Sequence, residues 1–485
     1  MTPLRIALVS AEATPFAKTG GLGDAVSGLT RFLARAGHDP RLFLPLYSSI
    51  DTADKGFEVV DYARDVPLQC GPHRLTFNLV TAPLPGGPPA YFIHCPPLYD
   101  RPSIYTGGAD DAARMAFLSR AAIECCQRMG WAPDVFHCND WHTALLPVYL
   151  RAHYAWDHLF DASRTLLSIH NIGYQGVFDK AALAEMALVE QSSWLPQEDL
   201  ADGHINFLKA GIVHATALST VSPTHAREIQ TPEYGSGLDP LLRQRSADLI
   251  GILNGVDTED WDPATDRLIP HHYDASSLEA KWRNKEDLLH SLGLGFRPET
   301  PVVGIVTRLT KQKGIDLLRE SLPWFLSHYD MQFVAVGSGD RTYEDMLGGI
   351  AISHPGRAYF HRGYDNKLAH WVEAGSDIFL MPSLYEPCGL NQMYSLKYGT
   401  VPVVRKTGGL ADSVSNYNWE HGTGTGFVFE HYTAEGLGWA LGAALETWRH
   451  PDAWTALVQR GMAEDFSWDK QGQEYIRLYE RLASR

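Results

Sequence analysis

The stretch Lys18-Thr19-Gly20-Gly21-Leu22-Gly23-Asp24 follows a short apolar run, residues 4–9, and leads into residues 25–33, whose apolar side chains recur at helical spacing. The order of strand, glycine-rich turn and helix predicts an anion-binding corner of an α/β domain. Glycines let backbone N–H groups approach a ligand closely, and Lys18 adds a full positive charge. The stretch therefore indicates a phosphate-type ligand.

A near-copy of this stretch stands late in the chain, Lys406-Thr407-Gly408-Gly409-Leu410-Ala411-Asp412. Neither copy has the spacing of a Walker loop or of a Gly-x-Gly-x-x-Gly dinucleotide fingerprint. Seven residues separate Ser10, at the expected end of the first strand, from Lys18, whereas only Arg405 lies between Val404 and Lys406. The two loops therefore cannot superpose in register, and we expect only Lys18 to contact a ligand phosphate.

Length and composition narrow the classes of protein. The 485 residues allow two to four domains, and the formal net charge of −16 argues against a general nucleic-acid binder. The six cysteines form no Cys-x-x-Cys pair, so neither a zinc site nor a redox motif is indicated, and they fit a reducing cytoplasm. Residues 4–9 are too short for a signal peptide, although Ala11-Glu12-Ala13 resembles a cleavage site, and no run reaches membrane-spanning length.

Strand-like and helix-like segments alternate along the chain and predict parallel sheets covered by helices on both faces. Residues 67–95 differ, because turn signals break them into what we expect to be a hairpin excursion. Residues 110–129 and 468–482 predict amphipathic helices, and residues 301–306 predict the first strand of a second α/β unit. A small anionic ligand bound by two such units is the first hypothesis.

Polar residues repeatedly follow the predicted strands. Asp140 and His142 follow the strand at 134–137, and His170 and Asn171 follow the strand at 164–169. Ligands of open parallel sheets bind outside the carboxyl ends of the strands, so these residues are site candidates by position as well as by type. Taken singly, each histidine is more often a structural hydrogen-bonding group than a catalyst.

Two more groups of this kind lie in the second half. Arg308 and Lys313 flank a turn before a helix. Cations are disfavoured at a helix start unless an anion offsets them. The planar guanidinium fork of Arg308 and the point charge of Lys313 together suit a diphosphate. Glu386-Pro387-Cys388-Gly389-Leu390 follows another strand. Cys388 at a helix start could act as a nucleophile, but nearby Glu386 opposes thiolate formation and no His and Asn partners accompany it.

Together these motifs resemble the bacterial glycogen synthases and plant starch synthases, retaining glucosyltransferases of the GT-B fold. The matching stretches stand in family order over nearly the whole chain: 18–24, Asn139-Asp140-Trp141-His142, His170-Asn171, Leu253-Asn254-Gly255-Val256-Asp257, Arg308-Leu309-Thr310-Lys311-Gln312-Lys313-Gly314, Glu386-Pro387-Cys388-Gly389-Leu390 and Arg405-Lys406-Thr407-Gly408-Gly409-Leu410-Ala411-Asp412. Any one motif is weak, whereas the joint match is specific.

The resemblance implies two Rossmann-like doubly wound α/β domains facing across a deep cleft. It implies an acceptor-binding domain over 1–258, a linker with one helix over 259–298, a nucleotide-sugar domain over 299–463, and a C-terminal segment over 464–485 whose helix crosses back to the first domain. The implied partners are an ADP-glucose donor and a glycogen or maltooligosaccharide acceptor, without nucleic acid, membrane, cofactor or metal, in the cytoplasm.

The resemblance also implies roles for single residues. Arg308 and Lys313 should bind the diphosphate and stabilise the departing ADP, with Lys18 as a further contact. Glu386 should hold the glucose hydroxyls, and His170 should lie near the anomeric carbon with Asp140 nearby. The remaining expected substrate contacts are Gly20, Gly21, Asp24, His142, Asn171, Asn254, Tyr364 (stacked on adenine), Cys388, Gly389 and Leu390.

Three points stay open at the level of sequence. The family usually has Thr where this chain has Asn391, and related transferases have a second Glu where it has Tyr394. A retaining glycosidase needs two carboxylates about 5 Å apart, and no such pair is evident in the strand-end motifs, so a front-face displacement is the working hypothesis. A sucrose- or trehalose-type synthase using UDP-glucose, and a non-catalytic sugar-nucleotide sensor, are the alternatives.

Overall fold

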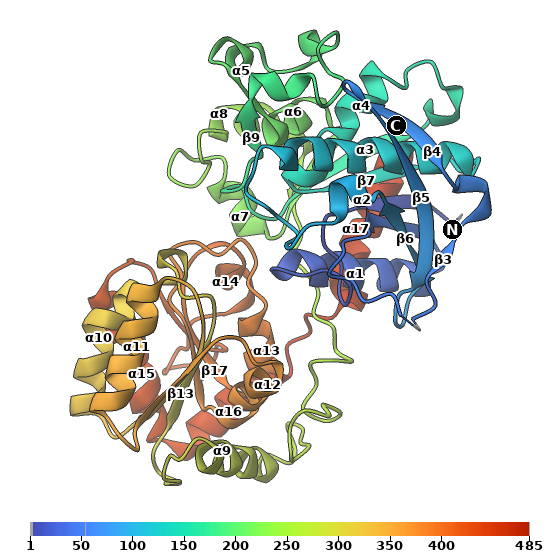
Figure 1. Cartoon of the computed structure of the whole chain (residues 1–485). Coiled ribbons are helices and arrows are strands. Elements are labelled where there is room, and N and C mark those ends of the chain that lie inside the picture. The colour runs from blue at the N-terminus through green and yellow to red at the C-terminus, as the bar shows by residue number, and fades with distance from the viewer. Residues whose placement is uncertain (1–2, 54, 485) are drawn as a thin grey trace. The chain divides into compact units, whose positions relative to one another are not determined.

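The computed structural model describes residues 3–53 and 55–484. The chain divides into two compact units, of which unit 1 is built on a mixed sheet and unit 2 on a parallel sheet, each with helices (Figure 1). Unit 1 contains the chain up to Gly255 together with the segment from Trp468 onward, and unit 2 runs from Val256 to Ser467. None of the described helices is both long and apolar enough to cross a membrane.

The sheet of unit 1 has the strand order β12-β11-β8-β7-β1-β2-β6-β5-β3, with β4 paired to β5. From β12 to β6 every pairing is parallel, and the pairings of β5 are antiparallel. The strands are β1 (Arg5–Val9), β2 (Asp39–Pro45), β3 (Glu58–Val59), β4 (Val66–Cys70), β5 (His73–Pro83), β6 (Pro89–His94), β7 (Val135–Asn139), β8 (Arg164–Ile169), β11 (Ala217–Thr220) and β12 (Leu249–Gly251). A separate pair joins β9 (Val177–Asp179) and β10 (His204–Asn206).

The predicted hairpin excursion is part of this sheet. β5 and β6 form the antiparallel hairpin, but β6 also pairs in parallel with β2 and so extends the main sheet. The helices of unit 1 are α1 (Gly21–Arg35), α2 (Pro96–Tyr99), α3 (Asp110–Arg128), α4 (Leu146–Ala152), α5 (Gln197–Ala201), α6 (Phe207–His214), α7 (Pro223–Glu228), α8 (Asp239–Gln244) and α17 (Trp468–Ala483). Short 3-10 turns include η2 (Trp141–Thr143).

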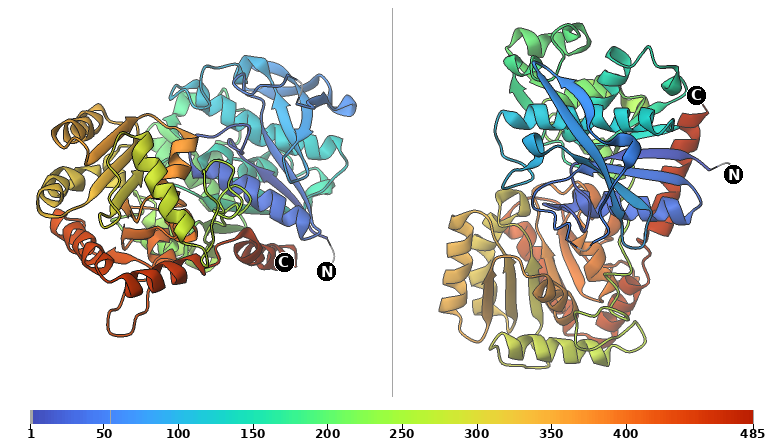
Figure 2. Two further views of the ribbon diagram at one scale, coloured as in Figure 1. Left: turned by 90° about the horizontal axis from the view of Figure 1, so that it is seen from below. Right: turned by 45° about the vertical axis from the view of Figure 1, so that its right-hand side comes forward.

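The last helix, α17, packs on the first one. It contacts α1 and β7, and Figure 2 shows it in red among the blue N-terminal segments from two directions. A Cβ added to Gly472 would meet the Phe32 ring at 2.3 Å, and one added to Gly28 would meet the Trp468 indole at 2.0 Å. Because glycines allow this close approach, α17 joins unit 1 although it is remote in sequence.

Unit 2 contains a six-stranded parallel sheet in the order β15-β14-β13-β16-β17-β18. Its strands are β13 (Val302–Val306), β14 (Gln332–Gly337), β15 (Ala358–Arg362), β16 (Ile378–Met381), β17 (Val401–Arg405) and β18 (Phe427–Phe429). Its helices are α9 (Glu279–Ser291), α10 (Ile315–His328), α11 (Arg341–Ser353), α12 (Asn366–Gly375), α13 (Asn391–Lys397), α14 (Gly408–Ser413), α15 (Ala434–Trp448) and α16 (Pro451–Met462), with a 3-10 turn η7 (Lys311–Lys313).

Successive side chains of β13 enter two different cores. Val303 and Ile305 join a cluster with α10, α15 and α16, whereas Val302 and Val306 join a cluster with α9 and α12. Because side chains alternate between the faces of a strand, an unbroken apolar run is what a strand covered on both faces requires. The apolar run predicted at 301–306 is that strand.

The segment before β13 is folded into unit 2. Tyr273 donates a hydrogen bond to the Tyr398 carbonyl at 2.7 Å, and Nδ1 of His370 lies 2.8 Å from Oδ2 of Asp266. Helix α9 packs on α12. These contacts attach the stretch between Val256 and β13 to the second sheet.

Candidate functional site

Asp140 organises the carboxyl edge of the unit 1 sheet. It follows β7, has a positive φ of 56°, and its side chain is buried. Oδ1 accepts hydrogen bonds from the backbone N–H of His170 at 2.6 Å and of Asn171 at 3.2 Å, directly after β8. Positive φ is uncommon for a residue other than glycine, and here it coincides with a carboxylate that joins the ends of two neighbouring strands.

The histidines at this edge are neutral at pH 7. Burial lowers the pKa of His170 to about 4, and burial, helped by His170, lowers the pKa of His142 to about 3. Nε2 of His170 lies 2.9 Å from Oδ1 of Asn139. Neutral imidazoles suit hydrogen bonds to uncharged hydroxyls, so this edge fits a sugar better than a phosphate.

Burial acts on Asp140 in the opposite sense. It raises the pKa of this carboxyl to about 7, the charge of Glu12 adds to the rise, and the two backbone hydrogen bonds oppose it. A carboxyl with a pKa near neutrality can exchange a proton at physiological pH. The structure thus brings four predicted residues together at one edge: Asp140, His142, His170 and Asn171.

Two residues that the sequence analysis did not select lie at this edge. Glu12 is buried and accepts hydrogen bonds from Thr19 N–H and the Thr19 hydroxyl, both at 2.6 Å, and from Gly20 N–H at 3.2 Å. The Tyr105 ring stacks on the His142 ring with 4.7 Å between centroids. Glu12 could have been selected because it is a charged residue within three positions of the end of a buried strand, β1 (Arg5–Val9), whereas Tyr105 lies in an irregular segment with no distinguishing pattern.

Lys18 faces Asp24 in this structure. Its Nζ lies 2.7 Å from Oδ2 and 2.9 Å from Oδ1, and Thr14 donates to the same carboxylate. Both side chains are partly exposed, at 47% and 25%, so the pair is worth less than about 1 kcal/mol and can open for another anion. A Cβ on Gly20 would meet nothing within 4 Å, which leaves space beside the loop.

The Asn254 side chain forms no hydrogen bond with Lys18, Asp140 or His170 within the described part of the chain. It is buried, and its Oδ1 has no hydrogen-bond partner among the described residues. The next residue, Gly255, lies against Trp468, so this motif also packs on α17.

In unit 2, Lys313 and Glu386 are in direct contact. Lys313 Nζ lies 2.6 Å from Glu386 Oε2, and Ser383 donates to the same oxygen at 3.0 Å. Glu386 thus offsets the charge of Lys313 at this helix start. The Arg308 side chain is exposed, and its guanidinium forms no hydrogen bond or ion pair with another described residue. Arg308 precedes the turn η7 and Lys313 ends it, so one short segment carries both a guanidinium fork and a lysine, the two kinds of group that suit a diphosphate.

The second glycine loop supports the segment that carries Glu386. Gly409 N–H donates to the carbonyls of Glu386 and Pro387 at 3.1 Å each. A Cβ on Gly408, which has φ +43°, would meet the Glu386 carbonyl oxygen at 1.9 Å, and one on Gly409 would meet that of Cys388 at 2.0 Å. These two glycines are required by close backbone packing.

The backbone of the residues after Glu386 accepts hydrogen bonds from a side chain of α13. Gln392 donates to the carbonyls of Cys388 at 3.1 Å and Gly389 at 3.0 Å, and Leu390 is the N-cap residue of α13. Asn391 donates to the Val306 carbonyl at the end of β13, at 2.8 Å. These contacts connect the Glu386 segment with the strand that leads to Arg308.

The two aromatic residues that drew attention in the sequence have different surroundings. Tyr364 is 67% exposed, and its hydroxyl donates to Asn366 at 2.8 Å. Tyr394 is buried and stacks on Trp261 at 4.0 Å, and Trp261 stacks on His370 at 3.7 Å. Tyr394 is thus part of the core of unit 2.

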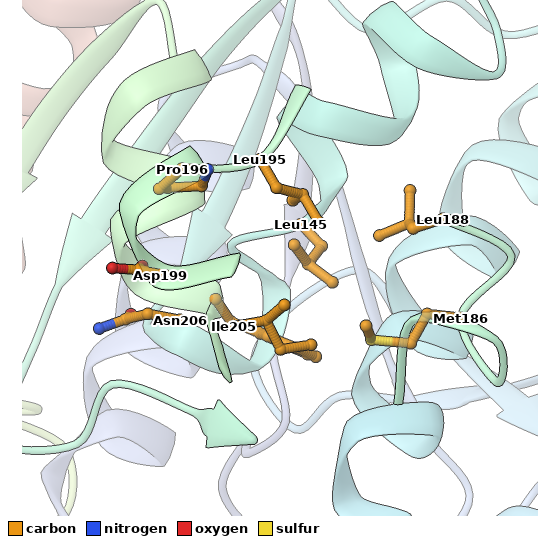
Figure 3. A pocket seen from close by; sticks show the side chains of 9 residues that line it. Leu145, Met186, Leu188, Leu195, Pro196, Asp199, Ile205 and Asn206 are labelled. Carbon is orange, nitrogen blue, oxygen red and sulfur yellow. The ribbon is translucent and has the colours of Figure 1, made fainter. Parts of the chain in front are cut away.

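Neither of two hollows in the structure contains a predicted site residue. A cavity of about 10 Å³ in unit 1, lined by Leu145, Met186, Leu188, Ile205 and their neighbours, is too small for a sugar (Figure 3). A groove of about 690 Å³ in unit 2 runs along β18 and the start of α15, between Lys406 and Trp439.

Comparison with known proteins assigns the family. Residues 5–244 match the starch synthase catalytic domain, and residues 292–457 match the glycosyl transferases group 1. The glycogen synthase of Anaeromyxobacter dehalogenans (strain 2CP-1 / ATCC BAA-258) is 45% identical, with 99% of each chain covered, and that of Koribacter versatilis (strain Ellin345) is 43% identical, with 99% of this chain and 98% of the relative covered. This chain belongs to the glycogen and starch synthases.

Solved structures agree with this family assignment. The catalytic domain of starch synthase IV from Arabidopsis thaliana, solved with ADP and acarbose, superposes with a TM-score of 0.93 at 34% identity, with both chains fully covered. A sucrose-phosphate synthase from Thermosynechococcus elongatus shares the fold at 17% identity, with a TM-score of 0.62 and 99% of each chain covered. This member of the glycogen and starch synthases is thus a glycosyltransferase with the GT-B fold, as the motif order predicted.

Proposed function

We propose that this enzyme transfers glucose from ADP-glucose to the non-reducing end of an α-1,4-glucan, with retention of anomeric configuration and release of ADP. The observation that carries the proposal is the Lys313–Glu386 pair, together with the exposed guanidinium of Arg308, which has no partner among the described residues. This arrangement occurs in a chain of which 99% aligns with a glycogen synthase. It combines two cations for a diphosphate with a carboxylate for sugar hydroxyls.

We assign the donor to the residues of unit 2. Arg308 and Lys313 bind the diphosphate and stabilise the negative charge that develops on the leaving phosphate. Tyr364 stacks on adenine through its exposed ring. Glu386 accepts hydrogen bonds from the glucose hydroxyls, together with backbone groups of Cys388, Gly389 and Leu390.

The groups of unit 1 act on the acceptor and on the transfer. His170 lies near the anomeric carbon, and Asp140, His142, Asn171 and Asn254 bind sugar hydroxyls. Lys18 contacts the donor phosphate once it leaves Asp24, and Gly20 and Gly21 leave room for that contact. Opening the Lys18–Asp24 pair costs little because both side chains are partly exposed.

We propose a front-face displacement. The acceptor hydroxyl oxygen bonds to the anomeric carbon on the face from which ADP departs, the bond between that carbon and the phosphate oxygen breaks, and the departing phosphate takes the hydroxyl proton. A covalent glucosyl-enzyme trapped on Glu386 or Asp140 would contradict this mechanism.

One assay separates this proposal from its alternatives. Purified protein is incubated with glycogen and either ADP-glucose or UDP-glucose, and nucleotide release and chain elongation are followed. We expect both with ADP-glucose. Nucleotide release with UDP-glucose alone would indicate a sucrose- or trehalose-type synthase that uses UDP-glucose as its donor. No nucleotide release with either donor would indicate a non-catalytic sugar-nucleotide sensor. We propose a cytoplasmic location, which the six cysteines support, because all of them are buried and none forms a disulfide within the described part of the chain.

A further inference from the structure

The carboxylate of Glu12 joins two parts of unit 1. Oε2 accepts from the backbone N–H groups of Thr19 and Gly20, which belong to the loop that carries Lys18. Oε1 accepts from the hydroxyls of Thr19 and Tyr105, each at 2.6 Å. Only 3% of Glu12 is exposed, so its carboxylate is largely removed from bulk water, and a buried carboxylate without hydrogen-bond partners would be costly.

The backbone around Glu12 is fixed independently of these bonds. The Ser10 hydroxyl donates to the Glu12 carbonyl at 2.7 Å and accepts from Glu12 N–H at 3.2 Å. Tyr47 donates to the Ala11 carbonyl at 3.0 Å. The carboxylate therefore projects from a segment just after β1 whose backbone is held by its own hydrogen bonds, and the loop is bound to this carboxylate.

Tyr105 extends the connection to the residues around Asp140. Its ring stacks on His142 with an interplanar angle of 20°, and its hydroxyl ends on Glu12. Glu12 thus contacts the Lys18 loop directly and the Asp140–His142 edge through one aromatic ring. A displacement of the carboxylate would move both.

We propose that Glu12 is a positioning residue, which holds the loop of Lys18 in register with the Asp140–His142 edge through the Thr19, Gly20 and Tyr105 hydrogen bonds. The expected effect of Glu12 on ADP binding and catalysis rests on the proposed function, whereas its effect on the position of the Lys18 loop does not. Glu12 accepts from two backbone N–H groups that could otherwise donate to a phosphate, those of Thr19 and Gly20. The loop therefore contacts a phosphate through the Lys18 side chain.

Amide exchange tests the positioning directly. In Glu12→Ala we expect faster hydrogen–deuterium exchange in the peptide that contains residues 18–21, because the N–H groups of Thr19 and Gly20 lose their acceptor. Glu12→Gln should stay close to wild type, since an amide oxygen can still accept from both N–H groups. Unchanged exchange in Glu12→Ala would overturn the proposal, whether or not the enzyme is active on ADP-glucose.

Ligand affinity tests the consequence. We expect Glu12→Ala to weaken ADP binding about tenfold by calorimetry, the cost of displacing one charged contact. Tyr105→Phe keeps the ring and every charge, and should weaken it less. Equal ADP affinity of wild type and Glu12→Ala would overturn the inference, whereas a wild-type protein that binds no ADP would count against the proposed function and leave the exchange result to decide this one.

The charge of Glu12 gives a readout that a purely structural role would not. The titratable side chains around Asp140 are Glu12, Tyr105, His142 and His170. If ionised Asp140 is the active form, the acid limb of kcat/KM in Glu12→Gln should move to lower pH by about half a unit, because a nearby negative charge is removed. Tyr105→Phe should not shift this limb. An unshifted limb in Glu12→Gln would contradict the proposed link to Asp140.

Discussion

Lys313 Nζ lies 2.6 Å from Glu386 Oε2, and a second lysine, Lys406, lies the same distance from Glu430 Oε1. The first pair is mostly buried and the second is exposed. Equal distances thus accompany different surroundings, and the exposed pair is a matched control for the buried one.

Glu386→Gln should lower turnover by about two orders of magnitude or more, with the fold retained. The amide keeps the shape but removes the charge that orients Lys313 and accepts the glucose hydroxyls. Steady-state kinetics with ADP-glucose and glycogen measures the effect, and circular dichroism checks the fold. Glu430→Gln should leave turnover near wild type. Near-normal turnover of Glu386→Gln would refute the role assigned to this carboxylate.

Arg308→Lys should weaken ADP binding about tenfold without changing stability by more than about 0.5 kcal/mol. The guanidinium is exposed and unpaired among the described residues, so only the bound diphosphate loses its planar fork. Calorimetric titration with ADP measures the change. Arg341→Lys, an exposed arginine near Asp345 on α11, is the control, and equal losses in both variants would argue against a specific site.

Lys18→Ala should reduce kcat/KM for ADP-glucose, whereas Lys406→Ala should not. The two lysines stand in nearly identical motifs, but Lys18 can leave a weak pair with Asp24, and the glycines after Lys406 support the Glu386 backbone. The kinetics of the two variants, measured side by side, decide the point. A loss in Lys406→Ala as large as that in Lys18→Ala would mean that the second loop also binds donor.

Gly409→Ala should destabilise the protein by about 1–3 kcal/mol, because the new Cβ would stand 2.0 Å from the Cys388 carbonyl oxygen. Gly20→Ala should change stability by less than about 0.5 kcal/mol, since its φ of −156° suits any residue and its Cβ would meet open space. Urea unfolding followed by circular dichroism compares them. Similar midpoints would contradict the close packing described for the second loop.

Acid should destabilise unit 1 between pH 6 and pH 4. The buried His137, His142 and His170 have pKa values of about 3, 3 and 4, so each takes up a proton on unfolding, while Asp140, with a pKa of about 7, releases one. The unfolded state thus binds two more protons, and the free energy of unfolding falls by about 3 kcal/mol per pH unit of acidification. The histidine contribution is complete above pH 6.5, whereas that of Asp140 is lost as pH rises through 7.

Urea unfolding at pH 6 and pH 5 measures this slope. His142→Phe keeps an aromatic ring between Tyr105 and Trp141 and removes one titrating group. Its slope should be smaller by about 1.4 kcal/mol per pH unit. A slope equal to that of wild type would show that His142 is not held neutral in the folded protein.

The order of strands, loops and helices could be predicted from the sequence, because apolar periodicity is local. Residues 4–9 and 301–306 predict buried strands, and β1 (Arg5–Val9) and β13 (Val302–Val306) lie there. Asp140 and His170 were placed at one edge because parallel strands end on the same side of a sheet. The motif order also sufficed for the family, since each motif follows a strand in a fixed sequence.

Other properties depend on segments that meet only in the folded chain. The low pKa values of the histidines and the raised pKa of Asp140 arise from burial, and the hydrogen bond from Tyr105 to Glu12 joins residues that are distant in sequence. The two near-identical glycine loops likewise diverge, because one lies on Glu12 and the other on the Glu386 backbone. Apolar periodicity depends only on neighbouring residues. The desolvation of a side chain and its hydrogen-bond partners depend on the residues that pack around it, and only the tertiary structure determines which residues these are.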